Sequence, residues 1–177
     1  MTNPANKTLY FAYGSNLSLT QMASRCPTST YHALAALHGW KWIIGERGYA
    51  NVVASPASAT ATSTFGLRGR PLAPADEDED EEERGEDYVV GMLYYLEAAD
   101  EASLDRAEGV PDAYVKQMLD VDVLGAGGKE TGERVQALVY VDVARTGMGV
   151  CKEEYVGRMN RGVRDAEGKG MSASYGE

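Results

Sequence analysis

The chain has 177 residues, of which 44% are hydrophobic, and its formal net charge is −10. This length suits one domain, residues 1–177, with a core of its own. No run approaches the roughly 20 apolar residues of a membrane span, and the N-terminal M-T-N-P-A-N-K lacks the basic and apolar regions of a signal peptide. We therefore expect a cytoplasmic protein that makes no contact with a membrane.

The negative charge is concentrated in one segment. Residues 76–87 hold ten acidic side chains and one basic one, so −9 of the total falls there and −1 remains for the rest. Nothing resembles the basic stripe that nucleic-acid binding requires, and no nucleic-acid partner is expected. We interpret residues 55–87 as an insertion in the single domain that is disordered at least in its acidic half. A docking role for the acidic run is the alternative.

The first predicted element is a strand, Thr8–Tyr13, because its β-forming run is too short for a helix. It ends in Y-G-S-N, and a helix is predicted directly afterwards, over Ser18–Arg25. One interpretation is a turn that caps this helix. The other is a loop whose backbone N–H groups bind an anion or a carbonyl oxygen. These residues alone leave both interpretations open.

Further along the chain, strands outnumber helices. The predicted strands are Tyr31–Leu37, Lys41–Gly45, Asn51–Ala54, Tyr88–Glu97, Tyr114–Leu124 and Arg134–Asp142. The other predicted helices are Asp100–Glu108 and Lys152–Ala166. This order predicts an α+β fold with a curved sheet or a small barrel.

The helix over residues 100–108 places a carboxylate where it is disfavoured. Asp100 is a plausible N-cap, and Gly109 supplies the usual helix stop. Glu108 therefore falls in the last turn, where the helix dipole raises the pKa of a carboxyl group and burial would raise it further. Such a group suits a general base that works near neutral pH. The alternative is a surface glutamate at a frayed helix end.

The third helix carries an apolar stripe at four-residue spacing, Tyr155, Met159 and Val163. We interpret Met159 and Val163 as core residues. The two cysteines, Cys26 and Cys151, fit no metal or redox spacing, and neither histidine has the neighbours of a metal site. No metal and no disulfide are expected.

Two motifs together resemble a known family. L-Y-F-A-Y-G-S-N-L near the N-terminus, and S-L-D-R-A-E-G-V followed shortly by A-Y-V, closely resemble the γ-glutamylcyclotransferases. G-Y-A-N-V-V and E-E-Y-V-G-R-M-N-R-G-V resemble further regions of that family. Asn16 favours the γ-glutamyl amino-acid branch, because the glutathione-degrading branch has Y-G-S-L and the γ-glutamylamine branch has Y-G-T-L.

The resemblance implies a small mixed β-barrel with flanking helices and a cofactor-independent enzyme. Such an enzyme cleaves γ-glutamyl amides by attack of the substrate's own α-amine on its γ-carbonyl, which releases 5-oxoproline and a free amine. It assigns Glu108 as the catalytic base. The implied substrate-binding residues are Ala12, Tyr13, Gly14, Ser15, Asn16, Leu17, Tyr114 and Tyr155. The partner is then a small γ-glutamyl compound, and the protein a monomer or homodimer.

Several alternatives remain at this point. The leaving group could be an amino acid, part of glutathione, or a glutathione S-conjugate. The chain could also be a non-catalytic binding module of the same fold, although the carboxylate of Glu108 at a disfavoured helix end argues against that. For Tyr155, packing in the helix stripe is the alternative to substrate binding.

Overall fold

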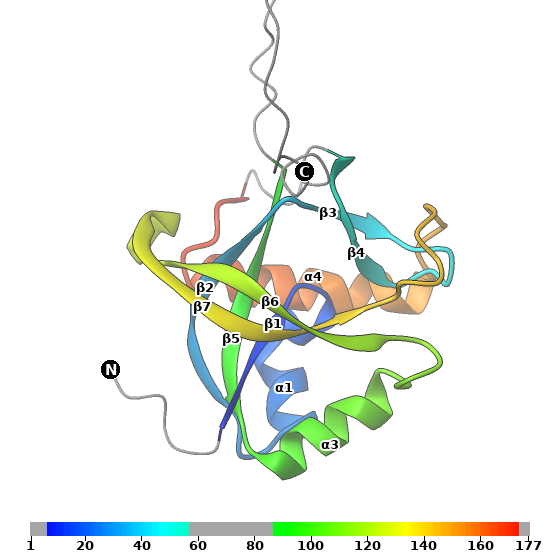
Figure 1. Cartoon of the computed structure of the whole chain (residues 1–177). Coiled ribbons are helices and arrows are strands. Elements are labelled where there is room, and N and C mark those ends of the chain that lie inside the picture. Colours follow the sequence, from blue (N-terminus) through cyan, green and yellow to red (C-terminus); the bar gives the residue numbers. More distant parts are fainter. Residues whose placement is uncertain (1–6, 57–86, 174–177) are drawn as a thin grey trace, which may run out of the picture.

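The core of the fold is a barrel that β-strands from both halves of the chain close together (Figure 1). The protein is seen here in a computed structural model that describes residues 7–56 and 87–173. The strands are β1 Thr8–Ala12, β2 Thr30–His38, β3 Trp40–Ile44, β4 Ala50–Ala54, β5 Tyr88–Leu96, β6 Val115–Leu124 and β7 Glu130–Val141. The helices are η1 Ser15–Leu17, α1 Leu19–Arg25, α3 Ala98–Ala107, η2 Ala126–Gly128 and α4 Glu153–Gly168.

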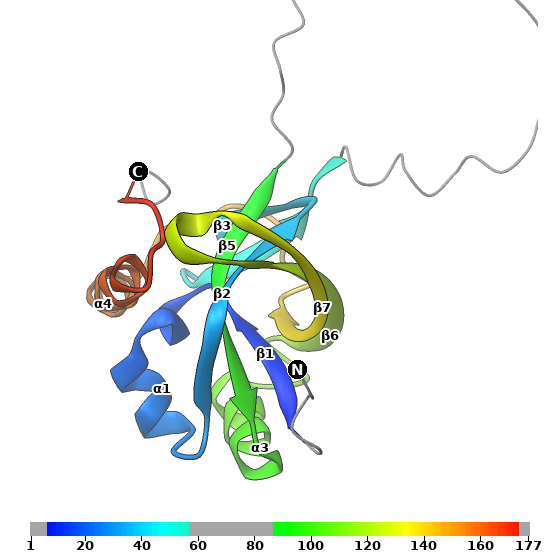
Figure 2. The same ribbon diagram turned by 90° about the vertical axis from the view of Figure 1, so that its left-hand side faces the viewer.

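The barrel order is β1-β5-β2-β6-β7, and β3 and β4 form a separate hairpin. Neighbouring strands are antiparallel, except that β7 closes the barrel against β1 in a parallel pairing at Tyr10 and Leu138. This mixed arrangement confirms the predicted α+β class with a small barrel. The long strands β6 and β7 curl around the rest, as Figure 2 shows, with α1 and α4 on one side of the barrel and α3 at its end.

Alternate residues of the strands serve two buried clusters. Phe11, Leu93 and Val139 are fully buried in one of them, and we place this cluster inside the barrel. Their sequence neighbours, such as Tyr10 and Tyr94, pack outside the barrel with residues of α1, α3 and α4. In β7 both faces are therefore apolar from residue 137 onwards, because a helix covers what would otherwise be a solvent face.

One predicted cap is wrong. Asp100 lies in the first turn of α3, and the N-cap is Glu97. The two form a capping box, in which the Asp100 carboxylate accepts the Glu97 backbone N–H at 3.2 Å. The helix gains two residues at its start because Ala98 and Ala99 are good helix formers and Leu96 ends β5.

Most of the predicted insertion, residues 57–86, lies outside the described part of the chain, so its disorder remains an expectation. Its two flanks meet: the Ser55 hydroxyl donates a hydrogen bond to the Asp87 carboxylate. Gly39 links both, because it donates its N–H to the Asp87 carbonyl at 2.7 Å and accepts the Ser55 N–H at 2.8 Å. The segment thus leaves and re-enters the fold at one place, the turn between β2 and β3.

Candidate active site

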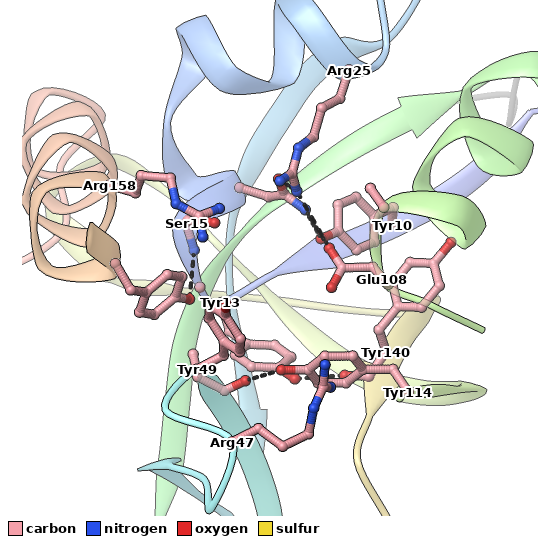
Figure 3. Close-up of a pocket in the computed structure, with 15 residues that line it drawn as sticks. Tyr10, Tyr13, Ser15, Arg25, Arg47, Tyr49, Glu108, Tyr114, Tyr140 and Arg158 are labelled. Atoms are coloured by element: carbon pink, nitrogen blue, oxygen red, sulfur yellow. Dashed lines mark hydrogen bonds and ion pairs between the residues drawn. The ribbon is translucent and has the colours of Figure 1, made fainter. Parts of the chain in front are cut away.

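A cavity of about 210 Å³ lies where η1, the end of α3, the β3–β4 turn and the start of α4 converge (Figure 3). Its walls are mostly aromatic and charged. The residues that line it are Tyr10, Tyr13, Gly14, Ser15, Asn16, Arg25, Arg47, Tyr49, Ala50, Ala107, Glu108, Tyr114, Tyr140, Tyr155 and Arg158. The two sequence motifs, about 90 residues apart in the chain, therefore meet in the wall of this cavity.

Glu108 is the C-cap residue of α3, and its side chain is only 18% exposed. Asn16 donates its side-chain N–H to Glu108 Oε1 at 3.1 Å, and the Arg25 guanidinium lies 3.6 Å from the same oxygen. Burial raises the pKa of Glu108, whereas Arg25, the Asn16 hydrogen bond, Arg158 and Arg47 each oppose that rise. Burial outweighs these partners. Asn16 and Arg25 therefore hold one oxygen of the Glu108 carboxylate in place, and the pKa of the group is raised above its ordinary value.

The Asn16 side chain holds its neighbours in place and has no hydrogen-bond donor left for a ligand. Its amide nitrogen also donates to the Tyr10 hydroxyl at 2.9 Å, and its carbonyl oxygen accepts from Gln21 at 2.8 Å and Arg25 at 3.0 Å. All four hydrogen-bonding positions of the side chain are therefore engaged. Since Asn16 is buried, this network fixes where Glu108 can lie.

Gly14 is needed for space. Its φ of −116° lies outside the left-handed region, so its role is not a special backbone angle. A Cβ atom built on Gly14 would lie 2.8 Å from the Tyr155 hydroxyl oxygen, closer than such contacts occur. That hydroxyl accepts the Ser15 backbone N–H at 3.1 Å, so the loop after β1 is bound to α4 through Tyr155.

Some of the amides in the predicted binding loop are engaged within the protein. The Ser15 N–H is taken by Tyr155, and the N–H groups of Leu17 and Ser18 donate to the carbonyls of Gly14 and Ser15. The last two of these bonds form because residues 15–17 wind into a turn of 3₁₀ helix. Because the Ser15 N–H donates to the Tyr155 hydroxyl, this hydroxyl is the polar group at that point of the cavity wall.

Four tyrosines complete the wall. Tyr13 and Tyr114 donate their hydroxyls to the carbonyls of Tyr140 and Ala50, at 2.5 Å and 2.7 Å. Tyr140 donates to the Asp105 carboxylate at 2.8 Å, and Tyr10 accepts from Asn16. Burial is the main cause that raises the pKa of every one of them, so all stay protonated and neutral.

The structure brings most of the predicted site residues together. Tyr13, Gly14, Ser15, Asn16, Glu108, Tyr114 and Tyr155 all line the cavity. Ala12 and Leu17 do not, because their side chains are buried in the core cluster under the helices. The core packing predicted for Met159 and Val163 is confirmed, since both are partly buried against the two clusters.

The sequence reasoning missed the three cavity arginines, Arg25, Arg47 and Arg158, and the tyrosines Tyr10, Tyr49 and Tyr140. Tyr49 lies inside the quoted G-Y-A-N-V-V, next to Gly48, and that segment could have been marked as a site. No local signal distinguishes the others, because each reaches the cavity from a different element.

Within residues 7–56 and 87–173 no group of three or more potential metal ligands gathers. In the same part of the chain no helix combines the length and apolarity needed to cross a membrane.

Residues 80–154 match the family model described as gamma-glutamyl cyclotransferase, AIG2-like. The matched segment includes Glu108 and Tyr114 but neither the loop after β1 nor Tyr155. No curated protein matches the sequence at a significant level.

Solved structures share the fold. An uncharacterized protein from Homo sapiens superposes with a TM-score of 0.66 at 22% identity, over 96% of this chain and 84% of that one. A structure titled gamma-glutamyl cyclotransferase gives 0.62 at 19% identity, with the same coverage. An AIG2-like protein from Mus musculus gives 0.52 at 16%, over 85% and 83%. Together with the match over residues 80–154, this shared fold confirms the resemblance that the two motifs indicated.

Proposed function

We propose that this chain, which has the γ-glutamylcyclotransferase fold and carries an AIG2-like segment, cleaves γ-glutamyl amides by cyclisation. The substrate's α-amine attacks its own γ-carbonyl, the amide C–N bond breaks, and 5-oxoproline and a free amine are released. One observation supports this most: the loop after β1 holds Glu108, at 3.1 Å from Asn16, inside a cavity of polar groups.

Proximity supplies much of the rate in this chemistry. Nucleophile and electrophile belong to one molecule, so the site has to fold the glutamyl group into attack geometry and needs no cofactor. A cavity of about 210 Å³ is below the range typical of drug-sized ligands. A compact γ-glutamyl group bent towards a five-membered ring suits this space.

Glu108 is the proton carrier. The α-amine is mostly protonated at neutral pH and cannot attack until a base removes its proton. Because Asn16 and Arg25 engage Oε1 of Glu108, Oε2 is the atom left to accept that proton. The raised pKa of the carboxyl group lets it hold the proton and then deliver it to the departing nitrogen.

Tyr155 is the donor for the carbonyl oxygen that becomes negative as the ring closes. Its hydroxyl oxygen accepts the backbone N–H of Ser15 at 3.1 Å, and its own hydrogen is the group that it can offer to the substrate. Burial is the main cause that raises the pKa of Tyr155, so the hydrogen is present at neutral pH. The backbone dipole of Ser15 behind the hydroxyl positions it before the reaction.

The test compares a γ-glutamyl dipeptide with its N-acetyl derivative. Acetylation removes the nucleophile and leaves the amide bond intact. We expect 5-oxoproline and free amino acid from the dipeptide, and no amine release from the acetylated compound. Equal release from both would mean hydrolysis by water. No turnover of any γ-glutamyl compound, with binding retained, would favour a binding module.

A further inference from the structure

The cavity contains one cation whose charge has no carboxylate partner among the described residues. Arg25 bonds to Asn16 and lies beside Glu108, and Arg158 forms a two-bond ion pair with Glu154 at 3.2 Å. Arg47 forms no ion pair with a carboxylate in this part of the chain, and its Nη1 atom is buried without a hydrogen-bond partner. A buried N–H donor of this kind is rare in folded proteins unless a ligand or water completes it.

We propose that Arg47 binds the carboxylate of the leaving amino acid, so that the enzyme selects γ-glutamyl α-amino acids over γ-glutamyl amines. This inference rests on the proposed cyclotransferase function and names the part of the substrate that lies beyond the scissile bond.

The backbone around Arg47 is held firmly. Arg47 lies in the tight turn between β3 and β4, where Gly45 donates to the Tyr49 carbonyl and Gly48 to the Gly45 carbonyl, both at 2.8 Å. Gly48 has a φ of +83°, which disfavours any other residue there. Its carbonyl accepts the Lys152 N–H at 3.1 Å and so joins the turn to the start of α4. The turn therefore projects Arg47 into the cavity at a fixed place.

Two tyrosines set the direction of the guanidinium group. Its central carbon lies 5.8 Å from the ring centre of Tyr49 and 5.7 Å from that of Tyr114. Contact with aromatic faces leaves the N–H groups at the edge of the guanidinium available. These donors are arranged as a fork that matches the two oxygens of a carboxylate.

The position of Arg47 relative to Glu108 indicates which carboxylate it meets. Figure 3 shows Arg25 and Glu108 on one side of the cavity and Arg47 across it, next to Tyr114. Of the three arginines, Arg47 lowers the pKa of Glu108 least, which agrees with this placement. The α-amine has to reach Glu108, and the α-carboxylate is attached to the same carbon. The far end of a bound dipeptide is therefore the part that extends towards Arg47.

The experiment uses two substrates that differ by one carboxylate, γ-glutamyl-alanine and γ-glutamyl-ethylamide. For each, kcat/KM for 5-oxoproline formation is measured with the wild-type protein, Arg47→Gln and Arg47→Lys. We expect the wild type to prefer the dipeptide and Arg47→Gln to reduce the dipeptide-to-ethylamide ratio by roughly 10- to 100-fold, the range for a hydrogen bond to a charged group. Arg47→Lys, which keeps the charge but loses the fork, should keep part of that preference.

Arg134→Gln is the matched control, because Arg134 pairs with Asp122 on β6 and β7, away from the cavity. It should leave the ratio unchanged, and melting curves of all variants establish that they are folded. An unchanged ratio in a folded Arg47→Gln protein would overturn the assignment. If neither compound is turned over, the proposed function fails separately. Calorimetric binding of the same pair then decides on Arg47: loss of the carboxylate preference in Arg47→Gln supports it, and equal binding refutes it.

Discussion

At the scale of single residues, Glu108 combines burial with positive neighbours. Burial disfavours the charged carboxylate, and Arg25 and Asn16 recover part of that cost while holding one of its oxygens. The net effect is a raised pKa, so Glu108 gives up its proton at a higher pH than an exposed glutamate does.

Glu108→Gln should retain the fold and lose about a thousandfold in kcat, since an essential proton carrier is worth on the order of 10² to 10⁴ in rate. The change preserves size and the oxygen that Asn16 contacts. The rate of 5-oxoproline formation measures the effect. Activity within tenfold of the wild type would remove Glu108 from the mechanism.

The same variant makes a stability prediction with a definite sign. Because the pKa of Glu108 is higher in the folded than in the unfolded protein, the folded state binds more protons, and this carboxyl lowers stability as pH rises above its ordinary pKa of 4.5. Glu108→Gln removes that loss. Its free energy of unfolding relative to the wild type should therefore increase from pH 4 to pH 7 in denaturant titrations. A difference that shrinks over that range would contradict the raised pKa.

Tyr155→Phe should lower kcat by roughly 10² to 10³, the typical effect of removing one oxyanion donor. It also leaves the Ser15 N–H without its acceptor, which costs about 1–3 kcal/mol of stability. Steady-state kinetics and melting curves measure the two effects. Tyr31→Phe is the control, because Tyr31 does not line the cavity. A stability loss with unchanged kcat would reduce Tyr155 to a packing residue.

At the scale of elements, α3 carries Glu108 at one end and a buried anchor at the other. Asp100 is 2% exposed and accepts the backbone N–H of Glu97, besides two hydrogen bonds from Thr28 at 3.3 Å and 2.7 Å. This carboxylate therefore fixes the start of α3 against the chain after α1.

Asp100→Ala should destabilise the protein by about 2 kcal/mol, because it removes a helix cap and leaves buried donors unpaired. Denaturant unfolding gives the free-energy difference. Asp120→Ala is the control: Asp120 is exposed on β6 and should change stability by no more than about 0.5 kcal/mol. Equal stability of the two variants would mean that Asp100 does not anchor α3.

At the scale of the whole molecule, a nearly neutral body carries one strongly acidic segment. Deletion of residues 76–86 removes a net charge of −8 and keeps Asp87, which binds Ser55 and Gly39. The sequence predicts disorder for this segment, and shortening a disordered loop changes its closure entropy by less than about 1 kcal/mol, so Tm should move by less than about 4 °C. Circular dichroism melting tests this. A Tm lowered by ten degrees or more would show that the segment packs on the body.

The sequence alone determined the helices and strands, and it determined the two motifs that contribute to the site. Period-two strands, the stop at Gly109 and the Y-G-S-N turn are local signals, so the predicted strands agree with the structure within a few residues. The N-cap of α3 was misassigned because Asp is a preferred N-cap residue and Glu is not, whereas in the structure Asp100 takes the third position of the helix and completes a capping box with Glu97.

Tertiary structure decided the rest. Barrel closure pairs β1 with β7 and brings the loop after β1 to the end of α3, which makes Asn16 a support for Glu108. The same closure directs Arg25, Arg47 and Arg158 into one cavity from α1, the β3–β4 turn and α4. No local pattern marks these arginines, because a guanidinium group on a long side chain serves equally well in solvent or in a pocket. Which of the two it does depends on contacts between segments far apart in the chain.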